Sequence, residues 1–214
     1  SLGLAEMHAR GIVHRDLKHN NVFVRSEEID GKTKLIAKIG DFGLALHEKD
    51  LVNEDFAQGA SIARPPEVCY PRSKKQQALN QTAKADVWAL GVMIYRLFFM
   101  KNNYKNVIED LPYLDRETYK YYPTFVNHMK YRIKFDQEDI DNFFDYMGTK
   151  NNQEKELLNL MRQCLQYHPG HRISSEEAAK KLGEISSSPI LDCAPNSQNC
   201  LSVNDFSSGW ETYF

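Results

Sequence analysis

The segment HRDLKHNN, residues 14–21, gathers two histidines, an arginine, a lysine, an aspartate and two asparagines around a single Leu17. Imidazole and carboxylate groups can transfer protons, cations can neutralise an anion, and carboxylate and amide oxygens can bind a hard metal ion. The same segment is also compatible with a solvated turn, so it does not establish a function alone. The tripeptide DFG at 41–43 is likewise too short to be decisive.

Five motifs in one order are more informative than either segment. They are HRDLKHNN at 14–21, DFG at 41–43, PPE at 65–67, DVWALG at 86–91 and HPGHR at 168–172. Together they resemble the signature of the eukaryotic-type protein kinase family, which has an HRD loop, DFG, the APE end of an activation segment, a buried helix and a late arginine. The resemblance implies transfer of the γ-phosphate of ATP to hydroxyl groups of a protein substrate, with Mg²⁺ as the metal ion.

The resemblance also assigns the groups that would react. Asp16 resembles the catalytic carboxylate that orients the substrate hydroxyl and accepts its proton, and Lys18 resembles the cation that steadies the γ-phosphate. Asn21 and Asp41 resemble the Mg²⁺ ligands, since both carry the oxygen donors that this ion prefers. Phe23 matches the position under the adenine ring. Lys18 also favours serine and threonine over tyrosine as the acceptor residue.

Further residues resemble the family's activation segment and structural supports. These residues are Arg15, Phe42, Gly43, Ser61, Glu67, Asp86 and Arg172. Asp86 is expected to receive backbone N–H groups from the catalytic loop. Glu67 and Arg172 are expected to form a buried ion pair that ties the activation segment to the later helices. His14 is expected to pack in the core beside Phe42 rather than to act as an acid, a base or a ligand.

The activation segment departs from the family pattern in GASIARPPE, residues 59–67. The family commonly has Thr at the position of Ala60, Tyr or Trp at that of Ala63 and Ala at that of Pro65. The Thr hydroxyl would normally support the catalytic carboxylate, so Ala60 removes that support. Ser61 is the candidate substitute after a shift of one residue.

Arg15 resembles the arginine with which many relatives bind a phosphorylated activation loop. Ser61 is the only residue with a hydroxyl group between Leu44 and Pro66. The same stretch has acidic residues at Glu48, Asp50, Glu54 and Asp55. We therefore expect Arg15 to pair with an acidic side chain and the loop to become ordered without phosphorylation.

The elements that position these residues can be predicted from apolar patterns. Helices are expected at 84–99, 139–147, 154–166 and 174–185. The first of them is apolar on nearly every side, as a buried helix is, and the last has a Ser cap. Residues 22–24 and 34–40 predict two strands of a hairpin with a long charged connection. Residues 41–67 lack periodicity and predict an extended loop. The expected fold is an α+β protein kinase-like fold, mainly α-helical, with a short β-hairpin near the catalytic loop.

Composition limits the classes of partner. The 214 residues are 42% hydrophobic and 26% charged, as in an ordinary globular protein, with a formal net charge of −2. No basic field is available to hold nucleic acid, and no run reaches the ~18 apolar residues of a membrane span. The cysteines lack metal-ligand spacing, which favours a reduced, intracellular chain in the cytoplasm.

Domain organisation follows from the two ends of the sequence. The chain opens at Ser1 with the pattern of a helix interior and no cap. We therefore expect residues 1–185 to be the large C-terminal lobe of a kinase domain and residues 186–214 to be a Ser- and Asn-rich tail. The N-terminal lobe is expected to be absent from this sequence and to be a binding partner of the C-terminal lobe. Such a fragment is expected to be inactive alone. Two alternatives remain: a pseudokinase-like interaction module, and a small-molecule phosphotransferase of kinase-like fold.

Overall fold

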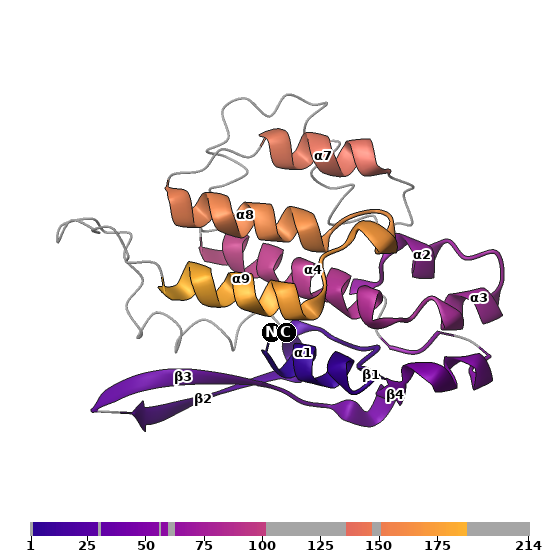
Figure 1. Ribbon diagram of the computed structural model, residues 1–214, viewed down its shortest axis with the longest axis horizontal. Helices are drawn as coiled ribbons and strands as arrows, with labels where there is room; N and C mark the ends of the chain where they lie inside the picture. Colours follow the sequence, from indigo (N-terminus) through magenta and orange to yellow (C-terminus); the bar gives the residue numbers. More distant parts are fainter. Residues whose placement is uncertain are drawn as a thin grey trace.

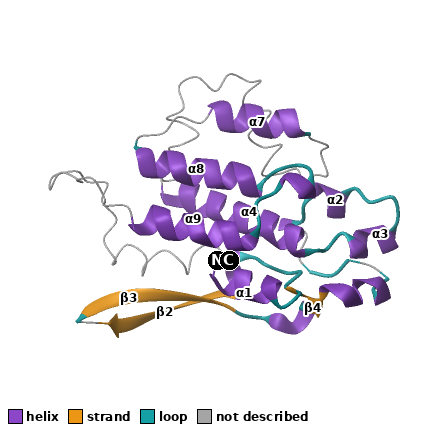
Figure 2. Ribbon diagram, viewed as in Figure 1, coloured by secondary structure: helices purple, strands orange, loops and turns teal. Residues whose placement is uncertain are grey.

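The computed structural model describes residues 2–29, 31–55, 57–59, 63–101, 136–146 and 151–187. Helices form the body of the molecule, and two small antiparallel sheets lie along one side of it (Figures 1 and 2). The mainly helical character predicted from the sequence, with a hairpin next to the catalytic loop, is therefore confirmed for the described residues.

Three helices pack against α8 (Figure 1). Helix α8 (Asn152–Cys164) contacts α4 (Ala83–Lys101), α9 (Ser175–Ser187) and α7 (Gln137–Tyr146). Helix α1 (Leu2–Ala9) packs against α9. All four predicted helices are present, with ends displaced by less than one turn, and the helical pattern at the start of the sequence forms α1.

Helix α4 forms the centre of the core because its sequence is apolar on nearly every side. Val87, Trp88 and Tyr95 are all 3% exposed or less. Gly91 allows α4 to approach α8 closely, since a Cβ atom there would lie 2.7 Å from the Cβ atom of Cys164. The buried aspartate in the first turn of α4, Asp86, is only 3% exposed and faces the catalytic loop.

Side chains cap the N-termini of α8 and α9 and stop the first turns from fraying. The side chain of Asn151 accepts the backbone N–H of Glu154 at 2.9 Å. At α9, the hydroxyl of Ser174 accepts the N–H of Glu177, and the Glu177 carboxylate accepts the N–H of Ser174, each at 3.1 Å. This reciprocal pair is a capping box, which confirms the predicted Ser cap. Hydrogen bonds from Ser174 also lower the pKa of Glu177.

The hairpin consists of β2 (Val22–Ile29) and β3 (Lys32–Ile39), with Ile29 opposite Lys32. Only residues 30 and 31 connect the strands, and Gly31 has a φ of 69°, which favours glycine. The predicted long connection is wrong, because its charged residues continue both strands. The hairpin is longer than expected because most of β2 is exposed, and an exposed strand can carry charged residues along its length.

Residues 41–67 contain several short elements, so the prediction of an extended loop is only partly right. Short 3-10 helices form η2 (Phe42–Leu44) and η3 (Glu48–Asn53). Between them, β4 (Leu46–His47) pairs antiparallel with β1 (Ile12–Val13). Elements of two to six residues are too short to show a hydrophobic period, which is why the sequence did not indicate them.

The remaining described elements are short. They are η1 (His19–Asn21), α2 (Pro66–Cys69), α3 (Lys74–Leu79) and η5 (Pro169–His171). Helix α9 continues to Ser187, two residues past the predicted end of the lobe at 185, and residues 188–214 of the predicted tail lie outside the described residues. No helix in the described part of the chain is both long and apolar enough to cross a membrane.

Candidate active site

Asp86 of helix α4 fixes the backbone of the catalytic loop. Its Oδ2 atom accepts the N–H of His14 at 2.7 Å and its Oδ1 atom accepts the N–H of Arg15 at 3.0 Å. The contact predicted for Asp86 is therefore confirmed. A second support comes from α1, where Nε2 of His8 lies 3.0 Å from the same Oδ2 atom and Nδ1 lies 2.8 Å from the hydroxyl of Ser175.

Two residues of the site have left-handed backbone conformations that only glycine adopts freely. Arg15 has a φ of 66° and Asp41 a φ of 57°, and they are the non-glycine residues with positive φ in the described part of the chain. Each such residue costs roughly 1–3 kcal/mol, so the surrounding contacts must hold it. Strain of this kind is concentrated at functional sites, and here it falls on the two loops that carry the predicted residues.

Asp16 lies between a cation and an amide. The Nζ atom of Lys18 is 2.6 Å from Oδ2 of Asp16. The side-chain nitrogen of Asn21 donates to the backbone oxygen of Asp16 at 2.8 Å and to its Oδ2 atom at 3.3 Å. Asn21 is 4% exposed, so these bonds are shielded from water. The structure thus brings together three of the residues that the sequence assigned to one site.

The base of the hairpin places Asp41 close to Asn21. The N–H of Gly40 donates to the backbone oxygen of Asn21 at 2.9 Å, and Asp41 is the next residue. Since the side-chain nitrogen of Asn21 is committed to Asp16, its Oδ1 atom is the one suited to a cation. One amide oxygen and one carboxylate fit Mg²⁺, which keeps waters and phosphate oxygens in its shell. Within the described ranges no cluster of three His, Cys, Asp or Glu could hold a metal ion.

His14 is a satisfied core residue, as predicted. Its side chain is fully buried, and Nε2 donates to the carbonyl of Gly40 at 3.0 Å. Nδ1 accepts the N–H of Asp16 at 3.3 Å, so both ring nitrogens have a hydrogen-bond partner. The ring also packs against Phe42 with 5.6 Å between centroids.

Aromatic side chains form an exposed surface beside this loop. Phe23 is 61% exposed and Phe42 is 53% exposed. The ring of Phe23 covers Gly40, where an added Cβ atom would lie 2.5 Å from Cε2 of Phe23. Gly43 follows in η2, close to the side chain of Asp41. A planar apolar ring in this position is suited to an aromatic base, which fits the assignment of Phe23.

Arg15 forms the ion pair that the sequence led us to expect, and the acidic partner is Glu54. The Nη1 atom of Arg15 lies 2.6 Å from Oε2 of Glu54, and Nε donates to the carbonyl of Leu44 at 2.7 Å. The two charged side chains are 5% and 25% exposed. Lys75 of α3 donates to the backbone oxygen of Glu54 at 2.8 Å, so a second element holds the same segment.

The ion pair predicted between Glu67 and Arg172 is also confirmed. Two parallel bonds of 2.5 Å and 2.7 Å join the guanidinium to the carboxylate. The other N–H groups of Arg172 donate to the backbone oxygens of Lys84, Gln166 and Tyr167. The side chain of Arg172 is 0% exposed, so all of its donors are satisfied without water.

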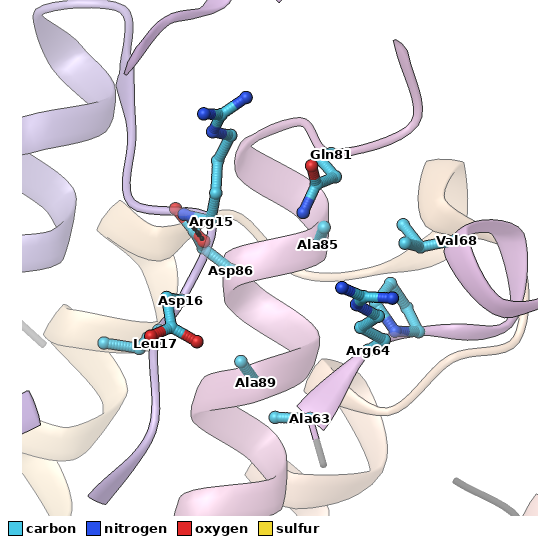
Figure 3. Close-up of a pocket in the computed structure, with 11 residues that line it drawn as sticks. Arg15, Asp16, Leu17, Ala63, Arg64, Val68, Gln81, Ala85, Asp86 and Ala89 are labelled. Atoms are coloured by element: carbon cyan, nitrogen blue, oxygen red, sulfur yellow. Dashed lines mark hydrogen bonds between the residues drawn. The ribbon is translucent and has the colours of Figure 1, made fainter. Parts of the chain in front are cut away.

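A pocket opens beside Asp16, between the catalytic loop, the segment that leads into α2, and helix α4 (Figure 3). Sequence reasoning missed its polar residues Arg64 and Gln81, and it missed the contacts of His8 and Ser175 with the site. No short-range pattern signals these contacts, because His8 and Asp86 are far apart in sequence. Ala60 and Ser61, for which the sequence predicted a lost and a substitute support of Asp16, lie outside the described residues.

Comparison with known proteins decides the family. A model of the protein kinase domain matches residues 1–182. The chain belongs to the eukaryotic-type protein kinase family. The serine/threonine-protein kinase ksp1 of Schizosaccharomyces pombe is 31% identical to this kinase chain over 172 residues, which are 79% of the chain and 30% of ksp1.

Other relatives of this kinase chain match over shorter stretches. The serine/threonine-protein kinase Nek5 of Mus musculus is 34% identical over 50% of the chain and 15% of its own length. The tyrosine-protein kinase receptor old-1 of Caenorhabditis elegans is 35% identical over 55% of the chain and 21% of its own length. The chain therefore spans less than a third of the length of these relatives.

Proposed function

We propose that this protein is a serine/threonine protein kinase that transfers the γ-phosphate of ATP to protein hydroxyl groups in the presence of Mg²⁺. The observation that carries the proposal is the pairing of Asp16 with Lys18 at 2.6 Å, in a loop fixed by two bonds to Asp86. The names of ksp1 and Nek5 support serine and threonine as acceptors, whereas old-1 is a tyrosine kinase.

The roles of the residues follow from their positions. Asp16 would hold the acceptor hydroxyl and take its proton, and Lys18, beside it, would balance negative charge on the phosphoryl group. Asn21 and Asp41 would hold Mg²⁺, and Phe23 would lie against the base of the nucleotide. When bound, Mg²⁺-ATP supplies the phosphoryl group and neutralises part of its charge.

A second lobe would complete the nucleotide site in this proposal. Phe23 and Phe42, beside the catalytic loop, are each more than half exposed, and an exposed apolar patch marks a surface that another part of a protein can cover. We also propose an intracellular location, because the buried Cys164 is a thiol and not part of a disulfide.

The second candidate function is a non-catalytic interaction module. It is favoured by Ala63, which is small where the family commonly has an aromatic residue, and by the exposed aromatic surface. In this case the same residues would bind a partner and no phosphate would be transferred.

Substitution of Asp16 by Asn separates the two candidates. We expect Asp16→Asn to lower phosphate transfer to a serine-containing protein by at least about a hundredfold, since a positioned proton acceptor contributes that much. Asn20→Ala, at an exposed position of the same loop, is the matched control and should retain activity. The measurement is incorporation of labelled phosphate, with nucleotide binding followed in parallel. Activity retained by Asp16→Asn would exclude the proposed role.

A further inference from the structure

Three of the residues that line the pocket beside Asp16 are alanines, which leave space between the larger side chains. They are Ala63, Ala85 and Ala89, and Asp16 and Arg64 also line the pocket (Figure 3). An aromatic residue at position 63, which is common in this family, would occupy part of this space. We call this hollow the Arg64 pocket, because Arg64 lies between Ala85 of α4 and Val68 of α2 in it.

Two arginines and two aspartates line the pocket, and they differ in their partners within the described residues. Asp16 is paired with Lys18, and Arg15 is paired with Glu54. Asp86, also at the pocket, is occupied by His8 and by backbone N–H groups. The positive charge of Arg64 is the one at the pocket for which the described part of the chain provides no carboxylate partner.

Arg64 is held in place by neutral groups alone. Its Nη2 atom donates to the backbone oxygen of Gly59 at 2.6 Å and to that of Gln58 at 3.3 Å. The side-chain amide of Gln81 fixes the same segment, since it exchanges two hydrogen bonds with the backbone of Gln58. The Nε atom of Arg64 is buried and has no hydrogen-bond partner in the described ranges. That buried atom is out of reach of a ligand, so the donors suited to bind an anion are those of Nη1, which makes neither of the bonds to Gly59 and Gln58.

We infer that Arg64 is a specificity-determining residue that binds an acidic side chain of the protein substrate next to the phosphorylated residue. The inference rests on the proposed function, in which the acceptor hydroxyl lies at Asp16. Residues of an extended peptide are about 3.4 Å apart, so a side chain one or two positions away from the acceptor reaches the adjoining pocket. Carboxylate is the chemistry recognised, and a phosphorylated side chain would offer a similar anion.

The test compares peptides that differ in charge near one acceptor serine. Each peptide carries Asp, its neutral isostere Asn, or Lys at one of the two positions on either side. We expect kcat/KM for the Asp peptide to exceed that for the Asn peptide by about tenfold at one position, as a partly shielded ion pair allows. A phosphoserine peptide at that position shows whether phosphate replaces carboxylate.

Variants assign this preference to the guanidinium. Arg64→Gln should bring the ratio of Asp to Asn peptides close to one, and Arg64→Glu should favour the Lys peptide. Arg72→Gln is the matched control, because Arg72 is exposed and lies outside the pocket. A ratio that Arg64→Gln leaves unchanged, or a wild-type protein with no preference at any position, would overturn the inference.

Two further measurements keep the inference testable if a variant fails to fold or activity is absent. With the wild-type protein, a rise in ionic strength should reduce the Asp preference, since salt screens ion pairs. Fluorescence anisotropy of labelled peptides measures the same preference in binding, without catalysis. Active protein with no acidic preference contradicts only the role of Arg64, whereas peptide binding without phosphate transfer contradicts the proposed function.

Discussion

At the scale of single residues, the pair between Arg15 and Glu54 determines how the activation segment is held. Removal of one member would leave the other charged and shielded from water, and such a loss costs about 3 kcal/mol in buried pairs. We expect Glu54→Gln to lower both phosphate transfer and the melting temperature. Asp55→Asn is the matched control, since Asp55 is an exposed neighbour.

The same pair predicts independence from phosphorylation. Glu54 supplies the negative charge that a phosphate would supply, so treatment with a phosphatase should leave the activity of the wild-type protein unchanged. If phosphatase treatment abolished activity, or if phosphate on Ser61 were required, Glu54 could not be the group that orders this segment.

Single residues also mark the limit of what the sequence predicts. That Arg15 needs an acidic partner could be predicted, but the choice of Glu54 among four candidates depends on the path of η3, which has no periodic signal. The strained conformations of Arg15 and Asp41 were not predictable, because contacts distant in sequence impose them. The same is true of His8, whose contact with Asp86 exists only after α1 and α4 have packed.

At the scale of elements, helices were predicted better than strands. A buried helix such as α4 has a long run of apolar residues that strands and loops rarely have. The hairpin was predicted too short, because its outer half is charged and exposed and its pattern is that of a loop. Helix α3 was missed since six residues rich in Lys and Gln lack an apolar stripe.

The contact between α4 and α8 leads to a prediction about alkaline pH. Cys164 is buried against Gly91, and burial raises the pKa of its thiol from 9.0 to about 12. Between pH 9 and pH 12 the thiol therefore keeps its proton in the folded protein, whereas it has lost the proton in the unfolded chain. Stability from this group is complete below pH 9 and falls as pH rises, by up to about 1.4 kcal/mol per pH unit.

Unfolding in urea at about pH 8 and pH 10 measures this effect. Cys164→Ala lacks the thiol, so its free energy of unfolding should decline less over the same interval than that of the wild type. Cys69→Ala is the control and should follow the wild type more closely, because Cys69 is partly exposed. Equal declines in the wild type and Cys164→Ala would contradict the assignment of the raised pKa to burial of this thiol.

At the scale of the whole molecule, Arg172 connects parts of the chain that are distant in sequence. Its guanidinium binds the carboxylate of Glu67 at the start of α2. It also donates to the backbone oxygens of Tyr167 in the loop after α8 and of Lys84 in the first turn of α4. The guanidinium carbon lies 4.9 Å from the centre of the Trp88 ring. The activation segment is thereby anchored to the helical body. Arg172 can satisfy all these acceptors because its planar group carries five N–H donors, whereas lysine has three on one atom.

This arrangement predicts that Glu67→Gln is destabilising by about 3 to 5 kcal/mol, the cost of breaking a buried ion pair. Arg172→Lys keeps the charge but is also destabilising, because lysine cannot make the two parallel bonds and the three backbone bonds of the guanidinium. Asp145→Asn is the control, because the pair between Asp145 and Arg162 is largely exposed and should contribute less than about 1 kcal/mol. Chemical denaturation gives both values. If the effects of Glu67→Gln and Arg172→Lys were fully additive in the double variant, the two side chains would act independently, and the anchor would have to be sought in the backbone acceptors instead.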